Sequence, residues 1–394
     1  MLRVVASILA VSTSFAIAAV PPTPEGTLIT KLLSTIGSDS SQPLSNANIA
    51  ALNLKENAIY SQIAYCINPN KPAWSGSLCN LIPNFALTAA GGDDNTNAPN
   101  WYVGYNSNAK SVVVAFEGTE TPEEWIDDDA RWPLVTLDPR LSAGNHFPSY
   151  ATHGFQNVWA VFADPVLKAV AALVNNPNPN APVHKIQVTG HSLGGAVASF
   201  SALQMSLNFP KTPIQLTTFA TPRIGSPDLA AWMLKNLGNN TIFTVYQRDP
   251  FVHAPPLDWA FSKYSHVGYE LWNSTNVPLA VLCSGLENPS CSDSLWYWYL
   301  SDHYGPFYGL VMGNDTGRCQ WPQDVILPQV SSMALPTPTA STPGIPFDVV
   351  YQTSVPVTTK TLVITLITLV GFPIFLRGIQ LLRKDIPVPV TSTK

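Results

Sequence analysis

Short runs of β-branched and apolar residues alternate with longer helical patterns between residues 111 and 246. Strands are predicted at Ser111–Phe116, Lys185–Thr189, Ile214–Phe219 and Thr241–Tyr246. Helices are predicted at Gly154–Val174, Leu193–Leu207 and Asp228–Asn236. Alternating strands and helices are typical of an α/β fold in which helices flank a mostly parallel sheet. One further helix, from Ile49 to Cys66, is predicted to pack on that sheet.

Length and composition limit the remaining possibilities. The 394 residues can form one large domain or two modest ones. Hydrophobic residues make up 46% of the chain and charged residues only 11%, which indicates a globular protein rather than a disordered one. The net charge of -5, without a basic cluster in the body of the chain, argues against nucleic acid as a partner.

The N-terminus has the pattern of a secretory signal peptide over residues 1–18. Arg3 supplies the positive start, Val4–Ala10 an apolar run, and Ala16-Ile17-Ala18 the small-residue cleavage pattern. An uncleaved membrane anchor is the alternative, although the apolar run is short for a span. Residues 19–45 are then predicted to be a loosely attached polar extension, and residues 46–325 to form the main domain.

The C-terminus changes composition sharply. Residues 326–359 are rich in Pro, Ser and Thr and are predicted to be a linker. Residues 360–382 follow as a predicted single transmembrane helix, in which Thr361–Leu376 contains no charge. Arg377, Arg383 and Lys384 place residues 383–394 in the cytosol by the positive-inside rule, with the main domain outside. A soluble protein with an apolar tail is the alternative.

The strongest motif is Gly190-His191-Ser192-Leu193-Gly194, an instance of G-x-S-x-G that stands between a predicted strand and a predicted helix. A serine on this sharp turn projects its hydroxyl above the sheet, and the glycines permit a tight backbone. The helix N-terminus favours the negative charge that develops during acyl transfer. Ser192 is therefore the predicted nucleophile.

A serine nucleophile needs a base and an orienting carboxylate. On this type of turn the order along the chain is Ser, Asp, His. Three histidines precede the serine and His191 belongs to the turn, so His253, His266 and His303 remain as candidate bases. The histidines lack the paired short spacings of zinc sites, and no Gly-rich phosphate loop is visible, so neither a metal nor a cofactor is predicted.

Several blocks of residues 49–319 resemble the fungal class 3 lipases, a family that includes feruloyl esterases. These blocks are Val112–Thr119 (VVVAFEGT), Val188–Gly195 (VTGHSLGG), Thr221–Gly225 (TPRIG), Arg248–Pro256 (RDPFVHAPP) and Ser301–Tyr304 (SDHY). The resemblance implies an α/β-hydrolase fold. It also implies that Asp249 is the triad acid and His303 the general base, with His253 and His266 in structural roles. Asp258 and Asp302 are the rival acids.

The oxyanion of the tetrahedral intermediate needs donors that are already in place. By position, the first is the backbone N–H of Leu193. By resemblance, the second is Thr119, which in the alternative interpretation merely ends a strand. The chain departs from the family at Glu117, where an arginine is common, and this puts in doubt any ion pair that the arginine would make.

The segment Glu120–Ala130 stands where the lipases carry a lid. Trp125 and Ile126 on one face of a short helix would cover an apolar groove in water and swing away at a lipid surface. The acidic residues of the segment are equally typical of a solvated loop.

Cysteines and glycosylation sequons agree with secretion. By resemblance, Cys66 pairs with Cys319 and Cys283 with Cys291, which leaves Cys79 either free or competing for a partner. Sequons stand at Asn239, Asn273 and Asn314, and each is glycosylated only if it lies on the surface.

Together these features predict a serine hydrolase of carboxylic esters, with acylglycerols or other lipid esters as substrates and a lipid interface as partner. A feruloyl or other aryl esterase is the alternative enzyme, because motifs fix the chemistry and the pocket fixes the substrate. A membrane-tethered binding protein without catalytic activity is the alternative of another class. The oligomeric state is not predicted.

Overall fold

A computed structural model describes residues 20–93, 98–119, 131–175, 180–274, 280–295, 298–313 and 316–321. The predicted signal peptide, linker, transmembrane helix and cytoplasmic tail lie outside these ranges. The predicted lid residues Trp125 and Ile126 and the sequon residue Asn314 also lie outside them.

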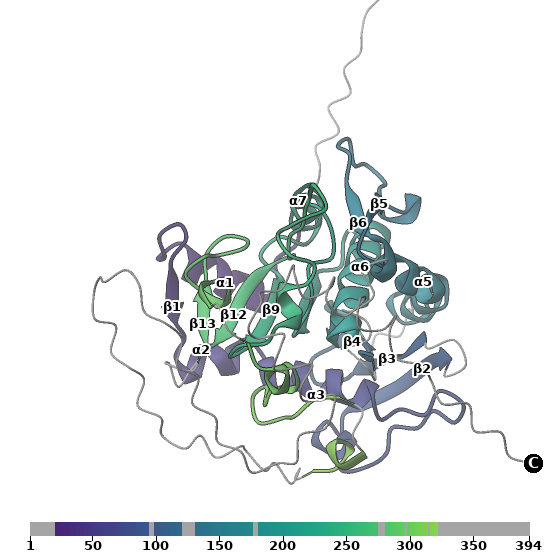
Figure 1. Cartoon of the computed structure of the whole chain (residues 1–394). Helices are drawn as coiled ribbons and strands as arrows, with labels where there is room; N and C mark the ends of the chain where they lie inside the picture. Colours follow the sequence, from purple (N-terminus) through teal and green to yellow (C-terminus); the bar gives the residue numbers. More distant parts are fainter. Residues whose placement is uncertain are drawn as a thin grey trace, which may run out of the picture.

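The described residues form a nine-stranded sheet with the order β1-β13-β12-β9-β8-β7-β4-β3-β2, which crosses the molecule in Figure 1. Its strands are β1 (Ser41–Pro43), β2 (Phe85–Asp93), β3 (Ala98–Asn106), β4 (Ser111–Phe116), β7 (Lys185–His191), β8 (Ile214–Phe219), β9 (Thr241–Tyr246), β12 (Tyr269–Asn273) and β13 (Val281–Cys283). The central pairs from β4 through β7, β8 and β9 to β12 are parallel. The outer pairs are antiparallel. The parallel centre and the flanking helices are those of the predicted α/β-hydrolase fold.

Helices cover both faces of this sheet. They are α1 (Pro24–Leu33), α2 (Asn46–Ala51), α3 (Leu54–Ala64), α5 (His153–Val174), α6 (Leu193–Asn208) and α7 (Pro227–Leu237). Along β4, Val112 and Val114 pack into the core with α5, α6 and α7, whereas Val113 and Ala115 pack into the core with α3. Side chains alternate between the faces of a strand, so β4 contributes to both cores. In Figure 1, α5 and α6 accordingly lie on the other side of β4 from α3.

Two short hairpin-like pairs lie outside the large sheet. β5 (Leu134–Thr136) pairs antiparallel with β6 (Tyr150–Thr152), and β10 (Asp258–Trp259) pairs antiparallel with β11 (Ser262–Lys263). β5 and β6 project beyond α6 at the top of Figure 1.

Within the part of the chain that the structure describes, α5 is the one helix with the length and apolar composition of a membrane span. Its buried residues, among them Phe155, Trp159, Phe162, Val166 and Val170, recur every three or four positions. This is the spacing of a helix with one apolar face, and that face belongs to the core shared with β4 and α6. We therefore interpret α5 as a core helix of the fold.

The segment that the sequence predicted as a loose extension is integrated into the fold. Its α1 begins at the cap residue Thr23, whose side chain accepts the N–H of Gly26, and β1 adds a strand to the edge of the sheet. The side chains of Ile29 and Leu44 are fully buried. The prediction was wrong because the few apolar residues of this polar segment, although some are only partly buried, pack against one cluster with Ile242, Leu271 and Leu282 of the sheet.

The predicted helix from Ile49 to Cys66 consists of two helices, α2 and α3. Asn53 separates them with a left-handed backbone (φ 53°), which asparagine tolerates better than most residues. Strands β1, β2, β3, β12 and β13 were not predicted from the sequence.

Candidate active site

Ser192 stands on the sharp turn between β7 and α6. Its backbone has φ 57° and ψ -128°, a conformation that is strained for a residue with a side chain. A Cβ atom at Gly194 would lie 2.4 Å from the carbonyl oxygen of Phe116 at the end of β4. Glycine at this position therefore allows α6 to start directly against β4, and the serine is held at the carboxyl edge of the parallel strands.

The side chains of Ser192, Asp249 and His303 lie in one hydrogen-bonded row. The Oγ atom of Ser192 is 2.8 Å from Nε2 of His303. The Nδ1 atom of His303 is 3.0 and 3.1 Å from the two carboxylate oxygens of Asp249. Asp249 and His303 are fully buried and Ser192 is 5% exposed. Because a carboxylate only accepts, Nδ1 carries the proton and Nε2 is free to accept from the serine hydroxyl.

The other two candidate acids take no part in this row. Asp302 accepts the backbone N–H of Arg248 at 3.0 Å, and Asp258 is exposed on β10. Burial raises the pKa of Asp302 to about 6. Arg248 and Asp302 directly precede Asp249 and His303, so this contact joins the same two segments that the Asp249–His303 pair joins.

Two contacts of Phe251 fix the acid and the histidine further. Its backbone N–H donates to Oδ1 of Asp249 at 2.8 Å. Its ring lies 4.1 Å from the imidazole of His303, measured between ring centroids. Phe251 therefore holds the orientation of both side chains.

The residue before Ser192, the predicted nucleophile, is itself part of the candidate site. His191 is fully buried, with Nδ1 2.7 Å from the hydroxyl oxygen of Tyr65 and Nε2 2.8 Å from the backbone carbonyl oxygen of His303. Burial lowers the pKa of His191 well below its usual value, so the ring is neutral. Sequence reasoning missed Tyr65, because no motif in the chain connects α3 with the serine.

The predicted oxyanion donors flank the serine. Leu193 is the first residue of α6, where backbone N–H groups have no partner within the helix. Thr119 follows β4 and is partly exposed. Between them, a Cβ atom at Gly118 would lie 2.1 Å from the hydroxyl oxygen of Tyr65 and 3.0 Å from Cβ of Ser192. Glycine is thus needed where this loop passes the nucleophile.

Glu117, the departure from the family pattern, is buried and has a structural role. Its carboxylate accepts the backbone N–H of Asn100 at 2.8 Å, and its own N–H donates to the carbonyl of Asn100 at 2.8 Å. These bonds tie the end of β4 to β3, immediately before Gly118 and Thr119.

The remaining two candidate bases belong to a buried charge network around Arg223. The guanidinium of Arg223 contacts Glu287 at 2.8 Å and Asp293 at 3.0 Å. His253 lies 2.9 Å from Asp293, and His266 lies 2.8 Å from Glu287. The opposing charges of His266 and Arg223 hold the pKa of Glu287 well below its usual range. The network fastens the segment after Asp249 to the segment after β13.

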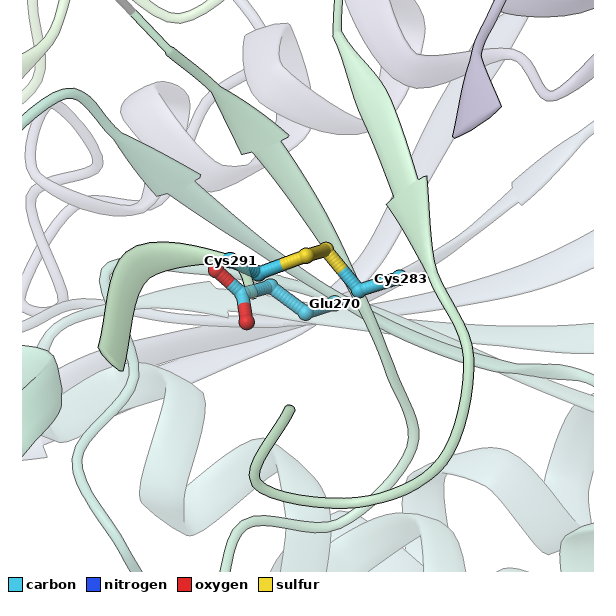
Figure 2. Close-up of side chains that lie close together, drawn as sticks. All are labelled: Glu270, Cys283 and Cys291. Atoms are coloured by element: carbon cyan, nitrogen blue, oxygen red, sulfur yellow. A yellow bond between two sulfur atoms is a disulfide. The ribbon is translucent and has the colours of Figure 1, made fainter. Parts of the chain in front are cut away.

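The structure forms two disulfides, Cys66–Cys319 and Cys283–Cys291, and leaves Cys79 as a buried free thiol. Burial raises the pKa of Cys79 to about 11, which makes it unreactive. Figure 2 shows the carboxyl group of Glu270 beside the Cys283–Cys291 bridge. Glu270, Cys283 and Cys291 are close enough to share a metal ion, but the two sulfurs are bonded to each other and are not thiolate ligands.

The asparagines of the two described sequons are held by contacts within the protein or are partly buried. The side-chain amide of Asn239 donates to the hydroxyl of Thr30 at 2.8 Å and accepts from the hydroxyl of Tyr269 at 2.8 Å. Asn273 is half-buried at the end of β12. Glycosylation of either residue stays a prediction.

Comparison with known proteins places this geometry in a family. Residues 113–259 match the family described as lipase (class 3). The chain is 26% identical over 220 residues to a secreted alkaline triacylglycerol lipase of Penicillium cyclopium, which covers 54% of this chain and 72% of the relative. It is 30% identical over 226 residues to a lipase of Rhizomucor miehei. Over this part of its length, the chain matches the class 3 lipase family.

For the Rhizomucor miehei lipase, the match covers 56% of this chain and 57% of the relative, so this chain spans little more than half of that protein. Lipase II from Rhizopus niveus has the same fold, with a TM-score of 0.60 at 23% identity. That likeness covers 70% of this chain and 99% of the solved chain.

Proposed function

We propose that this chain hydrolyses carboxylic esters through an acyl-enzyme intermediate, with Ser192 as nucleophile, His303 as general base and Asp249 as the orienting acid. The observation that carries the proposal is the 2.8 Å contact between Oγ of Ser192 and Nε2 of His303, with the opposite ring nitrogen of His303 on Asp249. A serine hydroxyl becomes nucleophilic only when a correctly oriented base accepts its proton.

In the first half-reaction, Nε2 of His303 takes the proton of Ser192 as Oγ bonds to the ester carbonyl carbon. The carbonyl electron pair moves to the oxygen, which the N–H groups of Leu193 and Thr119 are proposed to bind. Asp249 stabilises the imidazolium that forms. The tetrahedral intermediate then collapses, and His303 gives its proton to the leaving alkoxide, which departs as the alcohol.

In the second half-reaction, His303 takes a proton from water, and the resulting hydroxide attacks the acyl carbon. Collapse of this intermediate breaks the bond to Oγ, which recovers a proton from His303 as the carboxylic acid leaves. Each half-reaction uses the same base and the same oxyanion donors. No metal or cofactor takes part in these steps.

The substrates that this proposal favours are acylglycerols and related lipid esters. The support is the family match together with the Penicillium cyclopium relative, whose name describes it as a secreted triacylglycerol lipase. The same relative and the signal-like pattern of residues 1–18 support a secretory or extracellular location.

Ester hydrolysis tests the proposal directly. The purified protein and its Ser192→Ala variant are assayed on soluble p-nitrophenyl acetate, on emulsified acylglycerols and on methyl ferulate. We expect hydrolysis that the substitution lowers by about 10⁴-fold or more. Equal rates of ester hydrolysis by both proteins would reject the proposal that this chain is a serine esterase. A preference for methyl ferulate over acylglycerol would reject the substrate class while keeping the chemistry.

A further inference from the structure

The hairpin of β10 and β11 carries an exposed phenylalanine on a tight turn. Trp259 pairs with Ser262, so the turn consists of only Ala260 and Phe261. Both residues have positive φ angles, 48° and 66°. The side chain of Phe261 is fully exposed, and Leu257 at the base of the hairpin is 40% exposed.

Neither folding nor solubility accounts for this choice of residues. A two-residue turn with positive φ at both positions strongly favours Asn-Gly, because the left-handed backbone is strained for other residues. Exposing a large apolar ring to water gives no stability either. A position that breaks two local rules without a structural gain is where a functional role is expected.

The base of the hairpin is rigid, although its tip projects. The hydroxyl of Tyr264 donates to the backbone carbonyl of Trp132 at 2.7 Å, and the backbone N–H of Tyr264 donates to the carbonyl of Leu257 at 2.9 Å. The rings of Trp132 and Trp259 meet edge to face, with centroids 5.6 Å apart. Phe261 is therefore held away from the body on a fixed support.

The hairpin lies at the same edge of the sheet as the candidate active site. β7 and β9 belong to the parallel centre, so the segments that follow them, with Ser192 and Asp249, begin at one edge. The segment after Asp249 first passes Phe251, which contacts His303, and then forms the hairpin. The hairpin therefore belongs to the same stretch of chain as the candidate acid and follows it by only a few residues.

Other exposed apolar side chains gather at this edge. Gly225 pairs with Ala151 of β6 on one side and with Ser265, just after β11, on the other. This short ladder joins the hairpin to the β5–β6 excursion, where Phe147 is 74% exposed and Tyr150 is 41% exposed. Four of the seven large exposed apolar side chains of the described ranges lie in these two segments: Phe147, Tyr150, Leu257 and Phe261.

We propose that the β10–β11 hairpin docks this protein on the surface of an ester-lipid phase, with Phe261 inserted among the acyl chains. The proposal rests on the proposed function, because a lipid-ester substrate forms a separate phase that the enzyme must reach. Insertion removes the phenyl ring from water, which is favourable. Lys263 is exposed at the base of the hairpin, opposite the exposed Asp258, so the charged groups stay at the polar boundary while the phenyl ring enters the apolar layer.

The first test compares a lipid surface with a soluble ester, using the full chain. Phe261→Ser is expected to lower the rate on emulsified diolein about tenfold and to leave the rate on p-nitrophenyl acetate unchanged. Val161→Ser is the matched control, because Val161 is 61% exposed on α5, outside the two apolar segments. It is expected to change neither rate. Wild-type rates of Phe261→Ser on both substrates would overturn the proposal.

The second test does not need catalysis. In the Ser192→Ala protein, Phe261→Cys or Val161→Cys is labelled with an environment-sensitive fluorophore, since the free Cys79 is buried and the other cysteines are bridged. Phosphatidylcholine vesicles containing diolein should shift the emission of the label at position 261 to the blue, and not that at position 161. Equal shifts, or none at 261, would overturn docking even if the esterase assay succeeds. A shift without esterase activity in the wild type would reject the proposed function alone.

A third variant separates docking from folding. The double substitution Ala260→Asn with Phe261→Gly gives the turn its preferred residues and is expected to raise the melting temperature. It should nevertheless lower the rate on diolein emulsions as Phe261→Ser does. A variant that is more stable and equally active on the emulsion would show that Phe261 has no role at the lipid surface.

Discussion

The Nε2 atom of His191 lies 2.8 Å from the backbone carbonyl oxygen of His303, so the residue before the predicted nucleophile holds the backbone of the predicted base. The neutral ring donates through Nε2 and accepts the hydroxyl of Tyr65 through Nδ1. This chain of contacts runs from α3 to the backbone of the predicted base, and the ring of His191 also lies beside the ring of His303, with centroids 4.8 Å apart. Tyr65 and His191 are therefore positioning residues for His303.

Replacing Tyr65 with phenylalanine tests this positioning. Tyr65→Phe leaves Nδ1 of the buried His191 without its donor, which costs about 1–3 kcal/mol of stability. The imidazole is then free to turn, and His303 loses a fixed contact. We expect kcat on p-nitrophenyl acetate to fall about tenfold with little change in KM, because the loss falls on the geometry of the transition state.

Tyr102→Phe is the matched control for this variant. Tyr102 is fully buried, and its hydroxyl donates to the backbone carbonyl of Tyr60 at 2.8 Å, in the core that α3 shares with the sheet. This variant should lose comparable stability and keep its kcat. An equal fall in kcat for both variants would mean that Tyr65 acts through stability alone.

The three candidate acids give distinct expectations. Asp249→Asn replaces the acceptor on Nδ1 of His303 with a group that favours the wrong tautomer, and is expected to lower kcat about 10⁴-fold. Asp258→Asn, on the exposed hairpin strand, should leave kcat unchanged. Asp302→Asn should have an effect of less than about tenfold, because its amide oxygen can still accept the N–H of Arg248. Steady-state measurement of kcat on p-nitrophenyl acetate tests which aspartate is the triad acid. A larger loss of kcat for Asp302→Asn than for Asp249→Asn would contradict the assignment of Asp249.

The sequence predicted the centre of the fold well, for a physical reason. The strands β4, β7, β8 and β9 are buried on both faces and are therefore continuous apolar runs, which a pattern search finds. The turn at Ser192 needs glycines at fixed spacing, so its motif is visible in the sequence alone. The roles predicted for Asp249 and His303 came from the resemblance, and the structure brings both side chains into one row with Ser192.

The peripheral elements were missed for the converse reason. β1 has only three residues and β13 only three, and both gain their order from partners far away in the sequence. Burial of Tyr65 and Glu25 likewise depends on contacts that no local pattern records. The cluster around Arg223 had a visible signal, the TPRIG block, but its partners Glu287 and Asp293 lie in a segment without a motif.

Glu270 should make stability depend on pH. Burial raises the pKa of its carboxyl group from 4.5 to about 8, so the folded protein holds a proton that the unfolded chain releases. The contribution of this group is complete below about pH 4.5 and is lost as the pH rises through about 8, on the order of a few kcal/mol at most. We expect Glu270→Gln to remove this loss, so that the variant gains stability relative to wild type between pH 5 and pH 9.

Denaturant unfolding at several pH values measures the effect. In the wild type, the backbone N–H of Ser292 donates to Oε1 of Glu270 at 3.1 Å. Glutamine keeps an oxygen that can accept this bond and removes only the titrating proton. Asp258→Asn, which removes an exposed carboxyl group, is the control and should run parallel to wild type. Parallel curves for Glu270→Gln and wild type would show that Glu270 does not hold its proton in the folded state.

The predicted span of residues 360–382 is tested by carbonate extraction of membranes. The uncharged stretch Thr361–Leu376, followed by basic residues, should keep the full chain in the membrane pellet. A chain that ends at Ser354 should appear in the supernatant. Release of both chains would reject the span and leave an apolar tail.

The buried ion pair between Lys185 and Glu25 makes the N-terminal segment part of the stability of the whole sheet. Nζ of Lys185, at the start of β7, lies 2.7 Å from Oε1 of Glu25 on α1 and 2.8 Å from Oε1 of Gln215. Removing one partner leaves a buried charge unpaired, so Glu25→Leu is expected to destabilise by about 3–5 kcal/mol. Adding Lys185→Met should restore most of this loss, because an apolar pair replaces the ions. Both variants should keep their kcat on p-nitrophenyl acetate, because Lys185 lies at the start of β7 and Ser192 follows its opposite end. A double variant that is as unstable as Glu25→Leu would show that α1 is held by its apolar contacts and not by this ion pair.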